Sequence, residues 1–238
     1  MSGKYIIFGA TGATGSALTH MLYEDKKDCH LVAKNKVELE ELSSAYGYNY
    51  SVCNVLNLDF TNQLVKDLAT IEILGIAYCV GSIDLKPLKL TQAKDFISSY
   101  VLNVVSATEI IKTFQENLKK NSGSIVLFST VAAKRGFVNH SIISSAKAAV
   151  EGLTVSLAAE LSPKIRINCI SPSLTKSKIS NSLFQNKKNI DIIEKLHPLK
   201  RLGEGKDIAS LAKFLLSPEN SWITGQIIGV DGGRSNIA

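Results

Sequence analysis

The sequence has 238 residues, 45% of them hydrophobic and 20% charged, and its formal net charge is +6. These values fit one soluble globular domain with a sizeable core. No apolar run approaches the roughly 18 residues of a membrane span and no N-terminal segment resembles a signal peptide, so we expect a cytoplasmic protein without membrane partners. The four cysteines and four histidines are scattered, which predicts free thiols and no metal site.

Short β-branched runs alternate with longer amphipathic runs along the whole chain. The expected strands cover Lys4–Phe8, Cys29–Ala33, Tyr50–Cys53, Ile73–Val80, Ser124–Phe128, Ile165–Ile170 and Gln226–Val230. The expected helices cover Thr14–Tyr23, a stretch through Leu42 that ends before Gly47, Thr61–Ala69, residues 91–119, Ser145–Leu161, Asp191–Leu196 and Asp207–Leu216. This alternation predicts an α/β fold: one doubly wound parallel sheet, with a ligand at the carboxyl ends of its strands.

A glycine-rich loop joins the first strand to the first helix. Gly9, Gly12 and Gly15 stand at three-residue spacing. Such a loop lets the backbone approach a pyrophosphate, and the helix N-terminus adds amide donors and partial positive charge. Thr11 and Thr14 can donate their hydroxyls to the phosphates. The loop therefore predicts a dinucleotide site in preference to a purely structural turn.

The tip of the second strand distinguishes the two nicotinamide dinucleotides. NAD enzymes place an Asp or Glu there to bind the ribose 2′-hydroxyl, whereas this chain reads Ala33-Lys34-Asn35. A cation at Lys34 would pair with the 2′-phosphate of NADP. The alternative is a solvated lysine at the start of a helix. We expect NADP(H) as the cofactor, with NAD(H) as the weaker candidate.

The stretch Ser141–Leu153 reads Ser-Ile-Ile-Ser-Ser-Ala-Lys-Ala-Ala-Val-Glu-Gly-Leu. It resembles the active-site helix of short-chain dehydrogenases/reductases, which carry Tyr-x-x-x-Lys. Lys147 matches the Lys, but Ile143 stands where the Tyr belongs, and no tyrosine follows Tyr100. The resemblance covers nearly all of the chain. It implies a single Rossmann-type domain over residues 1–238, with about seven strands in the order 3-2-1-4-5-6-7.

The resemblance also assigns individual residues to the site. Thr130 stands at the position of the catalytic serine, and Asn103 at that of an Asn that supports a proton-relay water. In the family, the residue matched by Lys147 binds the ribose and lowers the pKa of the Tyr. The other matches, all expected to contact cofactor, are Asn54, Gly81, Pro172 and Ser177. His140, three residues before Ile143, is either a replacement acid or an ordinary loop histidine.

These observations favour an NADP(H)-dependent oxidoreductase of a small-molecule carbonyl or alcohol, with an altered acid. The alternatives are a non-catalytic NAD(P)-binding sensor or regulator and an inactive subunit of a hetero-oligomer. By resemblance, a homodimer or homotetramer is expected through the helices near 91–119 and 145–161.

Basic residues between Lys176 and Arg201 either form a solvated surface or attract an anionic ligand. Nucleic acid is not expected, because no aromatic residues are interleaved with them. The substrate-covering segment Asn181–Lys200 carries no specific signature.

Overall fold

The computed structural model describes residues 3–57, 59–68, 70–180 and 187–237. Within them, seven parallel strands form one sheet in the order β3-β2-β1-β4-β5-β6-β7, which confirms the predicted doubly wound sheet. The strands are β1 Lys4–Phe8, β2 Asp28–Ala33, β3 Asn49–Val52, β4 Ile73–Tyr78, β5 Ser124–Phe128, β6 Arg166–Pro172 and β7 Ile227–Val230. The α-helices are α1 Ala13–Glu24, α2 Lys36–Tyr46, α3 Phe60–Leu68, α4 Ala93–Tyr100, α5 Ser106–Lys120, α6 Ser141–Leu161, α7 Lys187–Lys195 and α8 Gly205–Leu216.

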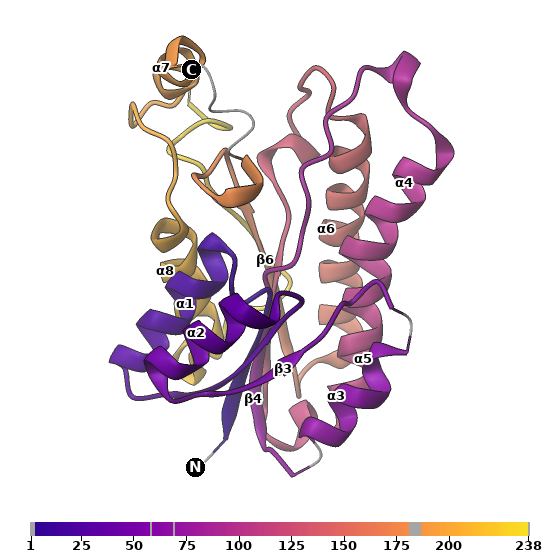
Figure 1. Cartoon of the computed structure of the whole chain (residues 1–238), viewed down its shortest axis with the longest axis vertical. Coiled ribbons are helices and arrows are strands. Elements are labelled where there is room, and N and C mark those ends of the chain that lie inside the picture. Colours follow the sequence, from indigo (N-terminus) through magenta and orange to yellow (C-terminus); the bar gives the residue numbers. More distant parts are fainter. Residues whose placement is uncertain (1–2, 58, 69, 181–186, 238) are drawn as a thin grey trace.

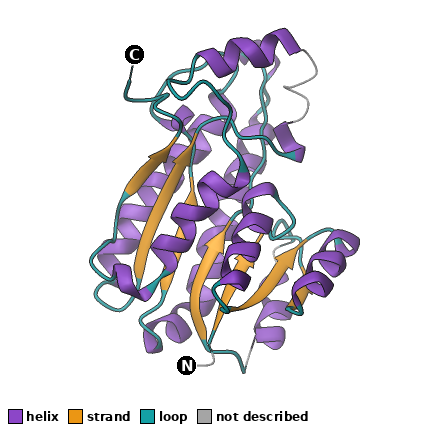
Figure 2. Ribbon diagram, turned by 90° about the vertical axis from the view of Figure 1, so that its left-hand side faces the viewer, coloured by secondary structure: helices purple, strands orange, loops and turns teal. Residues whose placement is uncertain are grey.

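Successive side chains of a strand point to opposite faces of the sheet. Apolar side chains lie on both faces here, and helices cover each of them. In β1, Ile6 and Phe8 belong to a core shared with α3, α5 and α6, whereas Tyr5 and Ile7 belong to a core shared with α1 and α8. Figure 1 shows these helix layers on either side of the sheet, and Figure 2 shows the strands side by side. The N-terminal end of the chain lies below the sheet in Figure 1, and α7 lies above it, beyond the carboxyl ends of the strands.

The predicted long helix over residues 91–119 is interrupted. One π-helical turn, Val101–Val105, lies between the end of α4 and the start of α5. At its end, the Ser106 hydroxyl lies 2.9 Å from the carbonyl oxygen of Val101 and 2.8 Å from that of Val55. The extra residue in this turn changes the direction of the side chains, and π-turns of this kind are frequent at functional sites. Asn103, in the middle of the turn, is buried.

Helix α6 begins at Ser141, four residues before the start predicted from the sequence. The burial of Ile142 and Ile143 extends the helix, although β-branched residues are modest helix formers. Ile143 and Lys147 therefore lie one turn apart on one helix face. Among the described helices, α6 is long and apolar enough to cross a membrane, by length and composition alone. Here it packs against β6, in the manner of a core helix.

Candidate active site

A cavity of about 1020 Å³ opens at the carboxyl ends of the strands, where a ligand was expected. Its wall is formed by residues that follow β1, β2, β3, β4, β5 and β6, with contributions from α6, α7 and the C-terminal turn. The predicted site residues on this wall are Gly9, Thr11, Gly12, Thr14, Lys34, Asn54, Gly81, Thr130, His140, Ile143, Lys147, Pro172 and Ser177. Two further predicted residues, Gly15 and Asn103, are not part of the wall.

The three loop glycines have different structural roles. Gly9 has a φ of +72°, in the left-handed region that favours glycine. A Cβ on Gly15 would lie 2.3 Å from the carbonyl oxygen of Gly9, so this position permits the close approach of helix and loop. A Cβ on Gly12 would meet only that same oxygen, at 3.2 Å. Because Gly12 lines the cavity, a side chain there would extend into the space for a ligand. The first turn of α1 contains no acidic residue to oppose a phosphate.

Basic side chains lie at the end of the cavity near β2. Lys34 follows β2 and is exposed on the wall, and Lys178, from the segment after β6, lies on the same wall. The Lys178 ammonium is 2.9 Å from the Glu38 carboxylate of α2, so an ion pair joins α2 to that segment. The Asn54 side-chain oxygen accepts from the backbone N–H of Leu56 at 3.2 Å. The amide nitrogen of Asn54 is therefore the atom that can donate to an adenine.

Lys147 is a buried residue on the cavity wall. Its ammonium donates to the Phe128 carbonyl at 2.8 Å. Burial lowers the pKa of Lys147 to about 8, because a charged ammonium is poorly solvated there. A Cβ on Gly81 would lie 3.4 Å from the Lys147 nitrogen, so Gly81 keeps this ammonium accessible from the cavity.

The side chain of Asn103 lies close to Gly81, beside the Lys147 ammonium. Its side-chain nitrogen donates to the Ser99 carbonyl at 2.8 Å. Its side-chain oxygen is buried and, within the described part of the chain, has no hydrogen-bond partner. That oxygen would lie 3.6 Å from a Cβ on Gly81, where the Lys147 nitrogen would lie at 3.4 Å. A buried acceptor without a partner is costly, so this point is suited to a small donor between Asn103 and Lys147.

Two neighbouring hydroxyls follow β5, and they point in different directions. The Ser129 hydroxyl lies 3.1 Å from the Lys147 carbonyl oxygen and 2.9 Å from a Glu151 carboxylate oxygen, so it is used within the α6 packing. The Thr130 hydroxyl oxygen accepts from the Ala132 backbone N–H at 3.3 Å. Its proton is not used in that bond and can be donated to a ligand. The Thr130 hydroxyl is therefore available to a ligand in the cavity.

Ile143 and His140 lie on the cavity wall next to this hydroxyl-bearing segment. Ile143 is 5% exposed and has no proton to donate. His140 immediately precedes α6, and its Nδ1 lies 2.7 Å from the Val138 carbonyl oxygen. Because a carbonyl only accepts, Nδ1 carries a proton, and Nε2 is the ring nitrogen that can exchange a proton with a ligand. The position is compatible with the replacement acid suggested by the sequence.

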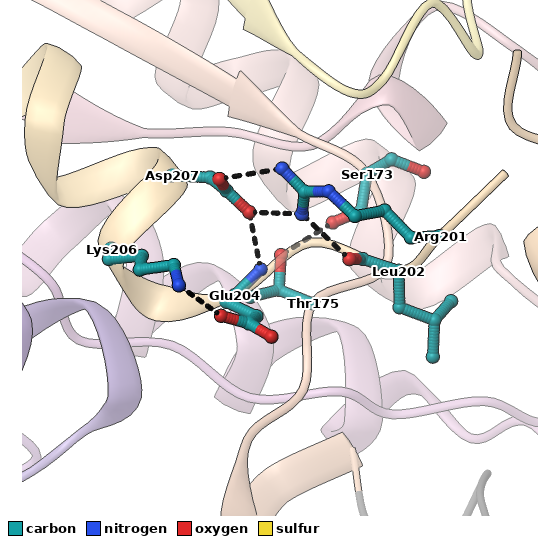
Figure 3. Close-up of polar contacts among 7 residues, drawn as sticks. All are labelled: Ser173, Thr175, Arg201, Leu202, Glu204, Lys206 and Asp207. Carbon is teal, nitrogen blue, oxygen red and sulfur yellow. Dashed lines mark hydrogen bonds and ion pairs between the residues drawn. The ribbon is translucent and has the colours of Figure 1, made fainter. Parts of the chain in front are cut away.

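The segment after β6 is fixed to the start of α8. A bridge joins Thr175 to Gly203, and the Thr175 hydroxyl donates to the Ser173 carbonyl at 3.0 Å. Figure 3 shows Asp207 contacting both the Arg201 guanidinium, at 2.6 and 2.8 Å, and the backbone N–H of Glu204. The predicted residue Ser177 lies in this segment, with its hydroxyl 2.9 Å from that of Ser180. Residues 181–186, part of the predicted substrate-covering segment, lie outside the described residues.

Sequence reasoning missed a buried histidine on the cavity wall. His197 is 2% exposed, and its Nδ1 lies 2.8 Å from the Ile193 carbonyl oxygen. Nδ1 therefore carries a proton, and in the neutral ring Nε2 accepts from the Ser173 hydroxyl at 2.8 Å. It also missed Phe137 and Arg234, which lie on the same wall. An isolated histidine and a C-terminal arginine belong to no local motif, so only the tertiary structure shows that they lie on the cavity wall.

Comparisons with known proteins show which sequences and folds this chain is similar to. A family model described as Enoyl-(Acyl carrier protein) reductase matches residues 15–235. A chloroplastic tropinone reductase homolog of Arabidopsis thaliana is 30% identical over 240 residues, which cover 97% of this chain and 74% of that relative. The structure of a short-chain type dehydrogenase/reductase from Mycobacterium ulcerans has a TM-score of 0.91 at 25% identity, covering 98% of this chain and 90% of that one. A structure of ElxO with NADP bound has a TM-score of 0.88 at 24% identity, covering 98% and 99%.

Proposed function

The chain belongs to the short-chain dehydrogenase/reductase family, and we propose that it is an NADP(H)-dependent oxidoreductase of a carbonyl or alcohol that works without the family's tyrosine. The observation that carries this proposal is one continuous cavity that is lined both by the glycine loop and by the buried Lys147. Thr130 and Lys147 line this cavity, and the Asn103 side-chain oxygen lies next to it, close to Gly81. The substitution at Ile143 changes the acid and leaves the rest of the site in place.

The described residues fit a nicotinamide dinucleotide. Gly12 leaves open space beside the N-terminus of α1, where backbone N–H groups suit a pyrophosphate. The Lys147 ammonium is accessible beside Gly81 and suits ribose hydroxyls. Lys34 would pair with a 2′-phosphate, which favours NADP(H). The ElxO structure, with NADP bound to the same fold, supports a cofactor of this class.

The chemistry divides between the cofactor and the protein. When bound, the cofactor supplies or accepts a hydride at the nicotinamide ring. The Thr130 hydroxyl donates a hydrogen bond to the substrate oxygen and so polarises the carbonyl. His140, when protonated, can deliver a proton at Nε2 to the developing alkoxide, which is the task of the missing phenol. Ile143 and its apolar neighbours exclude water from this part of the cavity.

Cofactor selection is tested by calorimetry with NADPH and NADH. One charge-assisted contact with the 2′-phosphate contributes roughly 1.5–3 kcal/mol, so we expect NADPH to bind about ten- to a hundredfold more tightly. Lys34→Ala should remove most of this preference. Lys36→Ala is the matched control, because Lys36 is exposed on the same segment and pairs with Glu40. Equal affinities for the two cofactors would contradict the proposal, as would an unchanged ratio in Lys34→Ala.

A non-catalytic NAD(P)-binding sensor, or an inactive subunit of a hetero-oligomer, is the second candidate. The buried, apolar Ile143 at the acid position favours it. Oxidation of NADPH by the purified protein with a broad panel of aldehydes and ketones separates the two candidates. Turnover that is reduced in Thr130→Val supports the oxidoreductase. Tight NADPH binding without turnover of any substrate supports the sensor or inactive subunit.

We also propose that the chain forms a homodimer or homotetramer through α4, α5 and α6. Large apolar side chains are exposed there, among them Ile97 and Tyr100 on α4 and Val155 on α6. Burial of such side chains between subunits would stabilise an assembly. Sedimentation equilibrium measures the oligomeric state directly. A monomer at micromolar concentration would contradict this proposal.

A further inference from the structure

Two arginines from distant parts of the chain meet at the side of the cavity. Arg135 follows the short 3₁₀ turn after β5, and Arg234 follows β7. The Arg135 guanidinium donates to the main-chain carbonyl of Arg234. The Arg234 guanidinium donates to the Leu196 carbonyl at 2.9 Å and lies 5.6 Å from the centroid of the Phe137 ring. These contacts hold two cationic groups next to each other.

Neither guanidinium forms an ion pair with a carboxylate in the part of the chain that the structure describes. Neighbouring cations differ in this respect, since Lys134 pairs with Glu151 at 3.4 Å. Asp231, the nearest acidic residue along the chain to Arg234, accepts instead from the backbone N–H groups of Gly233 and Ser235 at 2.9 Å. Partial burial and the Arg135 charge both lower the pKa of Arg234, as expected for two uncompensated cations.

The arginines border the space in which a substrate would lie. Arg234 and Phe137 share the cavity wall with His140, Ile143 and Thr130. A second pocket of about 380 Å³ has Arg135 in its wall and shares Ala132, Phe137 and His140 with the cavity. Phe137 and His140 therefore line both spaces, whereas Arg234 lies on the wall of the cavity itself and Arg135 on the wall of the second pocket. A substrate with its carbonyl near Thr130 can extend along Phe137 and His140 toward the two arginines.

We propose that Arg135 and Arg234 bind an anionic group of the substrate, a carboxylate or a phosphate. The inference rests on the proposed oxidoreductase function and names its substrate class: an oxo or hydroxy compound that carries an oxyanion, in preference to a neutral ketone or alcohol. The planar guanidinium fork matches both oxyanions in geometry and charge. Each guanidinium already uses one donor on a main-chain carbonyl, which fixes its position while leaving other N–H groups for a ligand.

The test compares acids with their own methyl esters. Calorimetry measures the binding affinities of pyruvate, 4-oxopentanoate and 4-formylbenzoate, and compares each with that of its methyl ester. The protein is saturated with NADP⁺ so that no reduction occurs. Glyceraldehyde 3-phosphate against glyceraldehyde forms the phosphate arm. We expect at least one anionic member to bind roughly tenfold or more tightly than its neutral counterpart, and the arm in which this occurs identifies the oxyanion. Equal affinities within every pair would overturn the inference.

Variants locate the effect. Arg135→Gln should weaken binding of the preferred anion about tenfold and leave binding of its neutral counterpart nearly unchanged. Arg135→Lys should retain part of the affinity for the anion. Lys120→Gln is the control, because it removes the same charge from an exposed site at the far end of α5. Arg234→Gln provides a second variant if Arg135→Gln melts early. Equal weakening of both members of a pair would show a structural role and overturn the inference.

NADPH oxidation with the same pairs separates this inference from the proposed function. Reduction of acids and esters at equal kcat/KM would retain the oxidoreductase and reject the anion site. Anion binding that depends on Arg135, without reduction of any pair, would retain the anion site for a ligand that is not reduced. Reduction that favours the anions and loses this preference in Arg135→Gln would support both. In that case KM should rise in the variant, with a small change in kcat.

Discussion

At the scale of single residues, the loss of one phenol determines what chemistry remains. Ile143 occupies a position one turn before Lys147, on a wall that Thr130 and His140 share. A general acid typically contributes 10²- to 10⁴-fold to a rate. An enzyme without it either acts on substrates that need little protonation or takes the proton from another group. His140 is the group that the geometry offers, through its Nε2.

Restoring the phenol should therefore raise carbonyl reduction. In Ile143→Tyr the new hydroxyl would lie near Lys147 and Thr130, and the large cavity gives room for the ring. We expect kcat/KM for aldehydes and ketones to rise by roughly 10²- to 10⁴-fold. Ile143→Phe, which adds the ring without the hydroxyl, is the matched control. No gain in Ile143→Tyr over Ile143→Phe, with NADPH binding intact, would favour the non-catalytic alternative.

Lys147 predicts a pH dependence of stability. Burial lowers its pKa from 10.5 to about 8 in the folded protein. Between these values the unfolded chain binds more protons at this position, so the Lys147 contribution to the free energy of unfolding rises with pH. Relative to Lys147→Met, the parent should gain up to about 3 kcal/mol between pH 7 and pH 10.5. Urea unfolding at several pH values measures this. If the free energy of unfolding changes with pH in the same way for the parent and for Lys147→Met, then Lys147 is not desolvated in the folded protein.

At the scale of elements, local pattern was enough to predict most of the sheet. A strand buried on both faces reads as a continuous apolar run, and Ile73–Tyr78 is such a run. Pattern did not reveal the π-turn Val101–Val105, because one extra residue barely changes the spacing of apolar positions in a helix. It also placed the start of α6 too late, since the sequence before Ser145 has weak helix propensity and its burial depends on the whole fold.

The candidate site was predictable where residues belong to one local motif. The glycine loop and Lys147 are of this kind, and most of the predicted positions lie on the cavity wall. The arginine pair was not predictable, because 99 positions separate Arg135 from Arg234. The same holds for Ser173 and His197, whose contact requires the segment after β6 to meet the end of α7.

The loop between β1 and α1 gives an element-scale prediction. A side chain at Gly12 would extend into the cavity and occupy the space for a pyrophosphate. The backbone there is extended, and a Cβ would lie 3.2 Å from the Gly9 carbonyl oxygen, which requires a shift of only a few tenths of an ångström. Gly12→Val should fold normally and lose NADPH binding by at least a hundredfold, an expectation based on roughly 3 kcal/mol of lost phosphate contacts. Gly152→Val, in open space on α6, is the control. Normal NADPH affinity in a folded Gly12→Val protein would place the dinucleotide elsewhere.

At the scale of the whole molecule, the distribution of charge matters for an anionic cofactor. The formal net charge is +6, and exposed lysines border the cavity at Lys34 and Lys178. Glu38 neutralises part of this charge through its ion pair with Lys178. The field at this end of the cavity therefore attracts phosphates, and the extra phosphate of NADPH should experience it most. Such a field is screened by salt, since the Debye length falls from about 10 Å at 0.1 M to about 3 Å at 1 M.

Ionic strength should therefore change the preference between the cofactors. Raising NaCl from 50 to 500 mM should weaken NADPH binding more steeply than NADH binding, because only NADPH places a 2′-phosphate near Lys34. In Lys34→Ala the two salt dependences should converge, because the local contact is lost. In Lys120→Gln, which lowers the net charge equally at a distant site, they should stay apart. Titrations at several salt concentrations measure these slopes. Equal slopes for NADPH and NADH in the parent would show that the 2′-phosphate does not lie in this field, and the assignment of Lys34 would then be wrong.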